Sequence, residues 1–566
     1  MSAIRRRILL GILAGAVASA TLGPVLGRPL WTLVWGISVG VLYCASLRPA
    51  RATYVDNLMT GAALGIPLWA VISIIAIPLL SREMPEWSAE QMRAHFPALV
   101  RWVLYGASLG VLAQVLNEVA LRVFGPEAQP ATPAPQQKKR IVILGGGFAG
   151  MRTAECLEKQ FQRDDTVSIT LVSDTNALLF TPMLAEVAGS SLEPSHISTP
   201  LRSSLRRTEF IRSRAEQVDL EGKRVILDTG RAADGSARIR EIPYDELVLA
   251  LGSVSNYLGM ANIEKLAFNF KSLLDAIRIR NHVIEMFECA DREPDGVLRR
   301  TLLTFVIAGG GFAGVELAGA LNDFAHGILA DYPNLHPQDL QVVLVHSRDR
   351  ILPELSESLA HYARGRMEAR GVTFRLNTRL LDANPGVVIL SDGEIPAQTL
   401  VWTAGTAPHP LLKSLPLEKD KRGAVVVDRT LALPGHPGLW ALGDCAAVVD
   451  AKTGKPCPPT AQFAQREAII LAKNIRAHLH GQPQEGFHFD SLGALCVVGH
   501  QTACAEFSVP LAKDRSVRFS GFFAWLMWRG IYLAKLPGLE RKIRVLVDWT
   551  IELFFPPDIV QTIDLQ

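Results

Sequence analysis

The chain has 566 residues, 49% of them hydrophobic, and a formal net charge of only +3. This length exceeds what one hydrophobic core holds, and the mean hydropathy of +0.20 is high for a water-soluble enzyme. The small charge gives no support to a nucleic-acid partner. The seven cysteines, none in a Cys-x-x-Cys pair, argue against a metal site or a redox disulfide.

Residues 1–125 are predicted to form an all-α, four-helix transmembrane domain. Each apolar stretch is about as long as the ~20 residues that cross a bilayer. The four stretches run over residues 8–26, 29–48, 57–80 and 98–117. Glycines recur in them, and small residues let helices approach closely in lipid. Residues 126–139, rich in proline and alanine, then form a semi-rigid linker.

Basic residues set the expected orientation of these helices. Arg5, Arg6 and Arg7 precede the first stretch, and Arg48 and Arg51 follow the second. Because basic loops stay in the cytoplasm, four crossings return the chain to the cytoplasmic side of the inner (cytoplasmic) membrane. The first stretch also fits a signal peptide, and its removal would leave residue 130 onward on the same side.

A strand, a glycine-rich loop and a helix follow the linker. The apolar strand 140–144 leads into a G-x-G-x-x-G loop, and a helical pattern and a second strand, 167–172, come next. In such a loop the glycines let the backbone approach a pyrophosphate at the helix N-terminus. The loop residues are Gly145, Gly147, Phe148, Ala149 and Gly150.

The same pattern returns about 164 residues later. The strand 303–308 leads into Gly309, Gly311, Phe312, Ala313 and Gly314, and a helix and the strand 340–345 follow. Two such loops predict two dinucleotide sites, and FAD is expected at the first. A further apolar strand ends in Gly443 and Asp444, whose carboxylate is suited to a ribityl hydroxyl of FAD.

These patterns predict an α/β flavoprotein with two tandem Rossmann-like dinucleotide-binding domains. The expected FAD-binding domain comprises residues 140–265 and 392–480, and the NAD(P)H-binding domain comprises residues 266–391. A C-terminal region covers residues 481–566.

Several segments then resemble the type II NADH:quinone oxidoreductases of the pyridine nucleotide-disulfide oxidoreductase superfamily, over about residues 139–556. The resembling segments are Leu179-Phe180-Thr181-Pro182-Met183-Leu184, Tyr244–Ser253, Arg350-Ile351-Leu352-Pro353, Val401-Trp402-Thr403-Ala404-Gly405 and Pro458–Ala464. The resemblance implies that NADH or NADPH passes a hydride to FAD. The flavin then reduces a membrane quinone, without proton pumping.

The resemblance also implies roles for single residues. Glu316 and Gln462 are the expected catalytic residues, and Gln462, Gln465 and Arg466 are expected near the quinone. A second family glutamine would fall at Arg466, which leaves the quinone type open. The other residues expected at FAD are Ser173, Asp174, Thr181, Pro182, Ala250, Gly252, Ala461 and Gln462. Those expected at NAD(P)H include Glu316, His346, Ser347, Arg348, Ala404 and Gly405.

The end of the strand 340–345 bears on the choice of dinucleotide. Sites for NADH usually carry Asp or Glu there, whereas sites for NADPH offer a cation to the 2′-phosphate. Here the chain reads His346-Ser347-Arg348. NADPH is therefore the hypothesis, with NADH binding beside a solvated Arg348 as the alternative.

The C-terminal region is predicted to contact lipid. Over about residues 517–556, aromatic and aliphatic residues alternate with Arg541, Lys542 and Arg544, and Pro537-Gly538 interrupts the pattern. Each half is shorter than a membrane span, which favours amphipathic helices lying in the interface. A buried helix pair or a homodimer contact is the alternative.

Two other functions stay open at this level. A sulfide:quinone oxidoreductase shares the fold but needs two redox cysteines, for which Cys289 and Cys457 are the candidate pair. A non-catalytic FAD-binding membrane sensor or assembly protein is the third reading, although the intact second loop argues against it.

Overall fold

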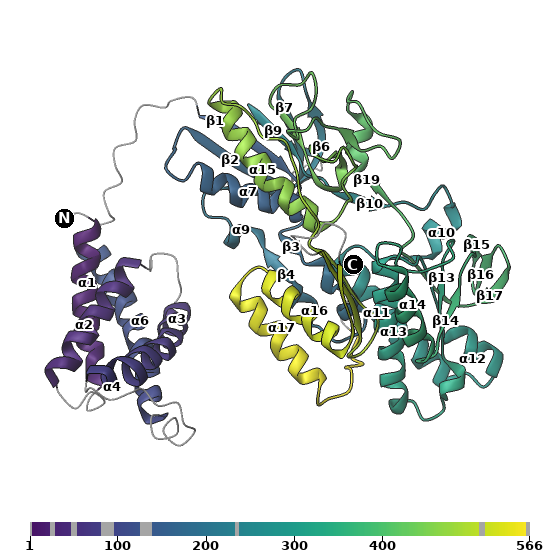
Figure 1. Ribbon diagram of the computed structural model, residues 1–566, viewed down its shortest axis with the longest axis horizontal. Helices are drawn as coiled ribbons and strands as arrows, with labels where there is room; N and C mark the ends of the chain where they lie inside the picture. The colour runs from purple at the N-terminus through teal and green to yellow at the C-terminus, as the bar shows by residue number, and fades with distance from the viewer. Residues whose placement is uncertain are drawn as a thin grey trace. The chain divides into compact units, whose positions relative to one another are not determined.

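The computed structural model describes residues 3–22, 29–46, 54–80, 96–124, 138–231, 237–508 and 516–561. The chain divides into two compact units, Met1–Pro135 and Gln136–Gln566 (Figure 1). The unit boundary falls within the predicted linker, most of which lies outside the described residues, as do Arg48 and Arg51.

Helices alone make up the described part of the first unit. They are α1 (Ala3–Ala18) with the turn η1 (Ser19–Thr21), α2 (Pro29–Ser46), α3 (Tyr54–Leu68) continued by η4 (Trp69–Ala76) and α4 (Ile77–Leu80), and α6 (Phe96–Phe124). Each predicted stretch overlaps one of these helical segments. The last helix runs seven residues beyond the predicted end at 117, and Glu118 in this extension accepts from Tyr54 Oη at 2.7 Å and Gln114 Nε2 at 2.9 Å.

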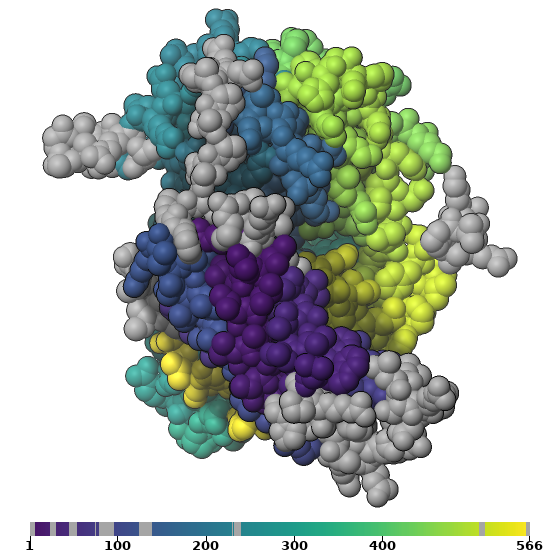
Figure 2. Space-filling view, turned by 90° about the vertical axis from the view of Figure 1, so that its left-hand side faces the viewer, coloured from purple at the N-terminus to yellow at the C-terminus, as the bar shows by residue number. Residues whose placement is uncertain are grey.

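Glycines bring these helices into backbone contact in two pairs. A Cβ on Gly15 would lie 2.4 Å from the Gly36 carbonyl oxygen, and one on Gly61 would lie 2.0 Å from that of Gly106. Any side chain would therefore separate α1 from α2, or α3 from α6. In the space-filling view α1 and α2 lie against each other without a gap (Figure 2).

Two segments of this unit have the length and hydropathy of a membrane span, Tyr54–Ser73 and Phe96–Val123. The apolar part of α2, Leu30–Cys44, is shorter. The described residues thus support two membrane spans, and the topology with four spans stays a prediction.

The second unit begins with a five-stranded parallel sheet in the order β21-β9-β1-β2-β5. Its strands are β21 (Leu439–Ala441), β9 (Glu246–Leu249), β1 (Lys139–Leu144), β2 (Val167–Ser173) and β5 (Glu209–Arg212). Helices α7 (Phe148–Gln160) and α15 (Ala461–Leu479) pack against each other beside it.

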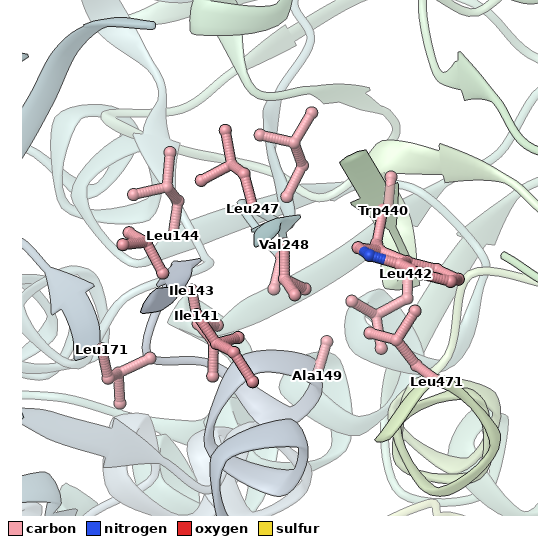
Figure 3. Close-up of a cluster of buried hydrophobic side chains, with 14 of the residues drawn as sticks. Ile141, Ile143, Leu144, Ala149, Leu171, Leu247, Val248, Trp440, Leu442 and Leu471 are labelled. Atoms are coloured by element: carbon pink, nitrogen blue, oxygen red, sulfur yellow. The ribbon is translucent and has the colours of Figure 1, made fainter. Parts of the chain in front are cut away.

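This sheet is buried because its central strands are apolar almost without interruption, as strands covered on both faces are. Ile141, Ile143, Leu171 and Leu247 are all 0% exposed, and Leu471 of α15 reaches the same cluster (Figure 3). Burying each such side chain contributes about 1.5–3 kcal/mol. The core fixes the carboxyl ends of the strands, where the glycine loop follows β1.

A second parallel sheet repeats this plan in the order β11-β18-β12-β13-β14. Its strands are β11 (Phe268–Asn269), β18 (Thr399–Trp402), β12 (Thr304–Ala308), β13 (Gln341–Val345) and β14 (Val372–Arg375). The predicted boundary at 391/392 is too early, since β18 pairs with β12. Three antiparallel strands precede β18, and they are β15 (Leu380–Asn384), β16 (Val387–Leu390) and β17 (Gly393–Pro396). Sequence alone does not show which of the two parallel sheets the chain joins after these strands.

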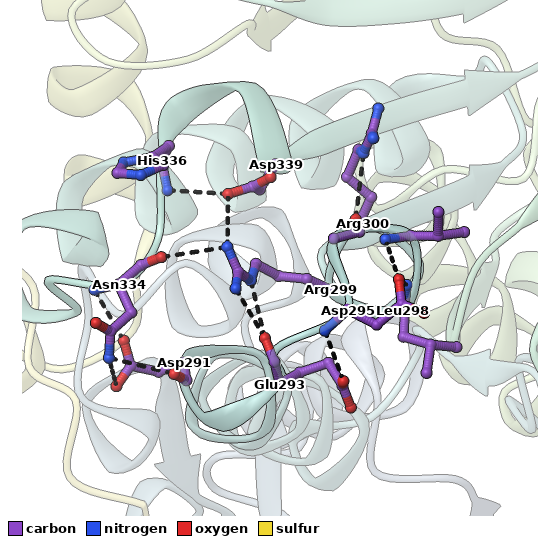
Figure 4. A network of polar contacts seen from close by, with 11 residues as sticks. Asp291, Glu293, Asp295, Leu298, Arg299, Arg300, Asn334, His336 and Asp339 are labelled. Atoms are coloured by element: carbon purple, nitrogen blue, oxygen red, sulfur yellow. Dashed lines mark hydrogen bonds and ion pairs between the residues drawn. The ribbon is translucent and has the colours of Figure 1, made fainter.

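The helices of this second half are α10 (Ala261–Leu266), α11 (Leu273–Arg292), α12 (Gly296–Leu302), α13 (Phe312–Ile328) and α14 (Glu357–Glu368). Arg299 of α12 ties the end of α11 to the turn η8 (Pro337–Asp339) (Figure 4). Its guanidinium donates to the Glu293 carbonyl at 2.8 Å and lies 4.0 Å from Asp339 Oδ2.

The second unit also contains short strands and short helices outside the two five-stranded sheets. They are β3 (Ala177–Leu179), η5 (Thr181–Met183), α8 (Leu184–Ala188), η6 (Pro194–Ile197), β4 (Ser198–Pro200), α9 (Leu201–Ser204), β6 (Arg214–Asp219), β7 (Arg224–Arg231), β8 (Ala237–Pro243), β10 (Ser253–Ser255), β19 (Thr406–Pro408), β20 (Val425–Val426) and β22 (Ala446–Ala447). Helix α8 contacts both α11 and α13.

The C-terminal region is an antiparallel sheet followed by two helices. Its elements are β23 (Gly493–Val497), β24 (Ala503–Ser508), β25 (Ser516–Gly521), α16 (Phe522–Lys535) and α17 (Leu539–Glu552). The prediction of helix from about 517 is wrong for residues 517–521, because Val517 and Phe519 alternate with polar residues and pair with β24. The break at Pro537-Gly538 is confirmed.

Candidate functional site

The first glycine loop has the shape of a dinucleotide cradle. Gly145 has φ +111°, and a Cβ there would lie 2.2 Å from the Ala250 carbonyl oxygen. A Cβ on Gly150 would lie 1.8 Å from the Gly145 carbonyl oxygen, whereas one on Gly147 would meet nothing within 4 Å. Two positions must therefore be glycine for packing, and the space before α7 stays open for a ligand.

The second loop reproduces this geometry. Gly309 has φ +126°, and a Cβ there would lie 2.5 Å from Thr403 Oγ1 and 3.1 Å from the Cα of Ala404. A Cβ on Gly314 would lie 1.9 Å from the Gly309 carbonyl oxygen, and Gly311 again faces open space. Both loops fit a pyrophosphate at a helix N-terminus, and the expected residues Gly147 to Gly150 and Gly311 to Gly314 lie there.

The predicted Asp444 lies beside the first loop. It follows β21, and its Oδ2 accepts a hydrogen bond from Ser253 Oγ at 2.6 Å. Ser253 Oγ in turn accepts from Lys271 Nζ at 2.6 Å. Burial lowers the pKa of Lys271, while Asp444 opposes that shift. Ser253 and Lys271 are site residues that the sequence reasoning did not single out, because they are far from Asp444 along the chain.

Beneath Asp444 lies a buried carboxyl that the sequence also did not reveal. Glu467 of α15 is 2% exposed, and its Oε2 accepts from the Gly443 amide at 2.7 Å. Burial raises the pKa of Glu467 to about 7. This bond fixes the turn that presents Asp444 to a ligand.

An aromatic row joins the first loop to the C-terminal helices. Phe148 packs edge-on against Phe180 at 5.8 Å, and Phe180 packs against Tyr532 of α16 at 6.1 Å. Thr181 and Pro182 begin η5 directly after Phe180. The predicted FAD loop, the Thr181-Pro182 segment and α16 are therefore one packed region.

The three residues expected near a quinone differ in their surroundings. Gln462 Oε1 accepts from the Leu492 amide at 3.2 Å, so its side chain is held by the segment that enters β23. Gln465 is partly buried, and Arg466 is exposed with its guanidinium 5.2 Å from the Phe489 ring. Burial and the neighbouring Arg466 both lower the pKa of Lys535, at the end of α16. Lys535 is thus a further residue of this face.

Glu316 lies on α13, two residues after the second loop. Its Oε1 accepts from the Val497 amide of β23 at 3.3 Å. Burial, with the charge of Glu186 as a smaller contribution, raises the pKa of Glu316 to about 8. Burial likewise raises the pKa of Glu186 to about 8. Two carboxyl groups that hold a proton near neutral pH therefore lie close together between the glycine loops and α16.

A buried arginine connects Glu186 to the C-terminal helices. The side chain of Arg529 is 9% exposed, its Nη2 pairs with Glu552, and it lies 4.0 Å from Glu186 Oε1. Its guanidinium lies 4.0 Å from the Trp525 ring centroid and 4.7 Å from that of Trp549. Trp549 Nε1 also donates to Glu186 Oε2 at 3.1 Å. No local pattern in the sequence predicts this cluster.

Glu186 and Glu316 line a cavity of about 680 Å³. Its other lining residues come from η5, α8, α11, α13, β23, α16, α17 and the segment that follows α17, and they include Pro182, Arg529, Asp548, Glu552 and Asp558. The cavity thus reaches from the Thr181-Pro182 segment to the outer surface of the second unit.

The candidate redox cysteines share no neighbour. Cys289 Sγ on α11 donates to Glu285, whereas Cys457 lies after β22, where its amide donates to the Val448 carbonyl. All seven cysteines are free. Among the described residues there is also no group of three or more His, Cys, Asp or Glu that could hold a metal ion.

Comparison with known families gives two matches. Residues 139–468 match the pyridine nucleotide-disulphide oxidoreductase family, and residues 492–558 match the NDH2 C-terminal domain. The helices of the first unit lie outside both.

Curated relatives agree with these matches. The chain is 30% identical over 444 residues to the type II NADH:quinone oxidoreductase Ndh of Mycobacterium tuberculosis, covering 76% of this chain and 90% of that protein. It is 31% identical over 431 residues to a probable NADH dehydrogenase of Dictyostelium discoideum, covering 75% and 91%.

Solved structures share the fold. NDH2 from Plasmodium falciparum in complex with NADH aligns with a TM-score of 0.67 at 18% identity, covering 75% of this chain and all of that one. The sulfide:quinone oxidoreductase of Aquifex aeolicus aligns with a TM-score of 0.56 at 19% identity, covering 74% and 95%.

Proposed function

This chain belongs to the type II NADH:quinone oxidoreductases within the pyridine nucleotide-disulphide oxidoreductases, and we propose that its first glycine loop holds FAD and its second a reduced nicotinamide dinucleotide. It is an oxidoreductase that passes electrons from the dinucleotide to a quinone without pumping protons. The observation that carries the two-site assignment is the repeated loop geometry at Gly145–Gly150 and Gly309–Gly314.

Bound FAD supplies hydride acceptance and two-electron release, which no side chain offers. The chain's own residues bind and orient the reactants. The FAD residues are those of the first loop with Ser173, Asp174, Thr181, Pro182, Ala250, Gly252, Gly443, Asp444, Ala461 and Gln462. The dinucleotide residues are those of the second loop with Glu316, His346, Ser347, Arg348, Ala404 and Gly405. Lys271, through Ser253, fixes the direction of the Asp444 carboxylate.

The overall reaction consumes one proton from water, because a dinucleotide delivers one hydride and a quinol carries two protons. Glu316 is the residue we propose to hold that proton, with Glu186 as its neighbour in the cavity. A raised pKa of about 8 keeps the carboxyl protonated near pH 7, as a proton donor requires.

The quinone is proposed to approach along α16, beside Gln462, Gln465, Arg466 and Lys535. Exposed apolar side chains cover this helix and α17, and they are Phe522, Phe523, Leu526, Leu539, Ile543, Leu546, Val547 and Ile551. Arg541, Lys542 and Arg544 lie among them, which suits an interface with anionic lipid. Binding to lipid vesicles tests this proposal, and a stable homodimer without vesicle binding would instead assign the surface to a second copy.

The first unit is proposed to cross the inner membrane four times, with the second unit on the cytoplasmic side. Two helices of sufficient length and the glycine contacts between paired helices support this topology. A protease site inserted within residues 126–139 should be cut in inside-out vesicles and protected in right-side-out ones. The reverse result would overturn the orientation.

The activity itself is tested with the FAD-loaded full chain in detergent. Oxidation of reduced dinucleotide should depend on an added short-chain quinone, and sulfide should not replace the dinucleotide. Cys457→Ala serves as the control, because it should leave the rate unchanged. Quinone reduction by sulfide, lost in that variant, would favour a sulfide:quinone oxidoreductase, and FAD binding without any turnover would favour the sensor.

A further inference from the structure

We propose that the second nucleotide site takes NADPH, and that His346 and Arg348 receive the 2′-phosphate of its adenosine ribose. The inference rests on the proposed function, since it names the dinucleotide that the same site uses. It concerns residues that lie at the far end of the dinucleotide from the flavin.

The position of His346 follows from the repeat within the chain. The Gly309 amide donates to the Val345 carbonyl at 2.9 Å, as the Gly145 amide donates to that of Val172 at 2.8 Å. A Cβ on Gly310 would lie 2.7 Å from His346 Cγ, and one on Gly146 would lie 2.7 Å from Ser173 Oγ. His346 therefore stands at the strand end where a site for NADH usually places Asp or Glu on the ribose hydroxyls.

The imidazole at this position offers a donor in place of an acceptor. Its Nδ1 accepts from the Gly310 amide at 3.1 Å. A neutral ring in this arrangement carries its hydrogen on Nε2, which is buried and has no hydrogen-bond partner among the described residues. Burial, aided by Arg348, lowers the pKa of His346, so the ring is neutral at pH 7. Phosphate oxygens only accept hydrogen bonds, and Nε2–H can donate to one.

A cation stands beside this donor. The Arg348 side chain is exposed and forms no ion pair with any residue that the structure describes, while its backbone is held by the Asn377 amide, which donates to the Arg348 carbonyl at 2.9 Å. Neighbouring arginines are already engaged: Arg350 donates to two backbone carbonyls, and Arg375 pairs with Asp392 at 2.9 Å. Arg348 is thus a guanidinium that remains for a phosphate.

Asp349 is the one carboxylate within residues 346–350. It lies four residues past the end of β13 and is exposed, so it does not occupy the position that faces the ribose. The variant Asp349→Asn therefore tests whether this carboxylate binds NADH. It leaves His346 and Arg348, the residues proposed to bind the 2′-phosphate, in place.

The first test compares kcat/KM for NADPH and NADH in the FAD-loaded full chain with a short-chain quinone. Arg348→Ala should lower kcat/KM for NADPH about tenfold, as the loss of one charge-assisted contact predicts, and leave that for NADH within about twofold. His346→Glu should reverse the preference toward NADH. Asp349→Asn should change neither value. A strong NADH preference that His346→Glu leaves unaltered would overturn the proposal.

A binding measurement keeps this test independent of turnover. By calorimetry the wild-type chain should bind adenosine 2′,5′-bisphosphate about tenfold more tightly than adenosine 5′-monophosphate, and Arg348→Ala should abolish the difference. Equal affinities in the wild type would contradict the 2′-phosphate site even if quinone reduction is observed. If the wild type binds the bisphosphate more tightly but reduces no quinone, the 2′-phosphate site is supported and the proposed function is contradicted.

Discussion

At the scale of single residues, burial keeps two carboxyl groups of the proposed site protonated. Glu316 and Glu186 each have a pKa raised to about 8, and they lie between the two glycine loops and the C-terminal helices. The resemblance to the family singled out Glu316, which follows the second loop. Glu186 escaped notice as a site residue, because its significance comes from Arg529 and Trp549, more than 340 residues away.

Glu316→Gln should slow quinone reduction by at least about tenfold, in the range that a lost proton donor costs, while flavin reduction by the dinucleotide changes little. The wild-type rate should fall as pH rises through about 8, where the Glu316 carboxyl loses its proton. Stopped-flow traces of the two half-reactions between pH 6 and pH 9 measure both effects. A variant with the wild-type pH profile would remove Glu316 from proton handling.

Glu316 should also affect stability. Its pKa is raised above that of the unfolded chain, so its contribution is full below about pH 4.5 and is lost as pH rises through about 8. The melting temperature of the wild type should therefore drop between those values, and Glu316→Gln should reduce the drop. Thermal unfolding in detergent across that range measures it, and parallel curves would contradict the burial of this carboxyl.

At the scale of elements, Arg529 holds the two C-terminal helices to α8. Arg529→Ala would leave the partly buried Glu552 carboxylate without its cation and would remove the guanidinium beside Glu186, and breaking a buried pair typically costs about 3–5 kcal/mol. Arg544→Ala is the matched control, because the Arg544–Glu540 pair is exposed and its loss should cost no more than about 1 kcal/mol. Denaturant unfolding measures the free energy of unfolding of both variants. Equal decreases would show that the Arg529 cluster stabilises the protein no more than an exposed ion pair does.

The paired helices of the first unit give a second prediction at this scale. Gly106→Leu forces a side chain against the Gly61 carbonyl and should destabilise the α3–α6 contact by about 1–3 kcal/mol. Leu104→Phe, at a position 53% exposed on the same helix, should have little effect. Protease resistance of the first unit in detergent reports the difference. If both variants resist equally, the helices do not pack through these glycines.

Local patterns predicted the elements that carry a local signature. The glycine loops, the strands before them and the break at Pro537-Gly538 were all readable, because backbone approach and chain reversal restrict the residue types at those positions. The strand β25 and the sheet to which β18 belongs could not be predicted in this way, because strand pairing depends on partners that are distant in the chain. The Asp444–Ser253–Lys271 chain was missed for the same reason.

At the scale of the whole molecule, the chain combines a matched catalytic unit with a helical unit outside the family match. The catalytic unit carries its own apolar, basic surface on α16 and α17. Removing residues 1–135 should therefore leave quinone reduction and vesicle binding intact and abolish integral membrane insertion. Sedimentation with vesicles after an alkaline wash distinguishes the two kinds of attachment, and loss of activity on truncation would give the first unit a part in the reaction.

Electrons are proposed to pass from the dinucleotide to the quinone through one bound flavin. This path is tested most directly by following the flavin absorbance of the FAD-loaded full chain without oxygen. A reduced dinucleotide should bleach the flavin, and a short-chain quinone should then restore its absorbance, one quinone per flavin. A flavin that is not bleached, or is bleached and not restored by quinone, would contradict this path.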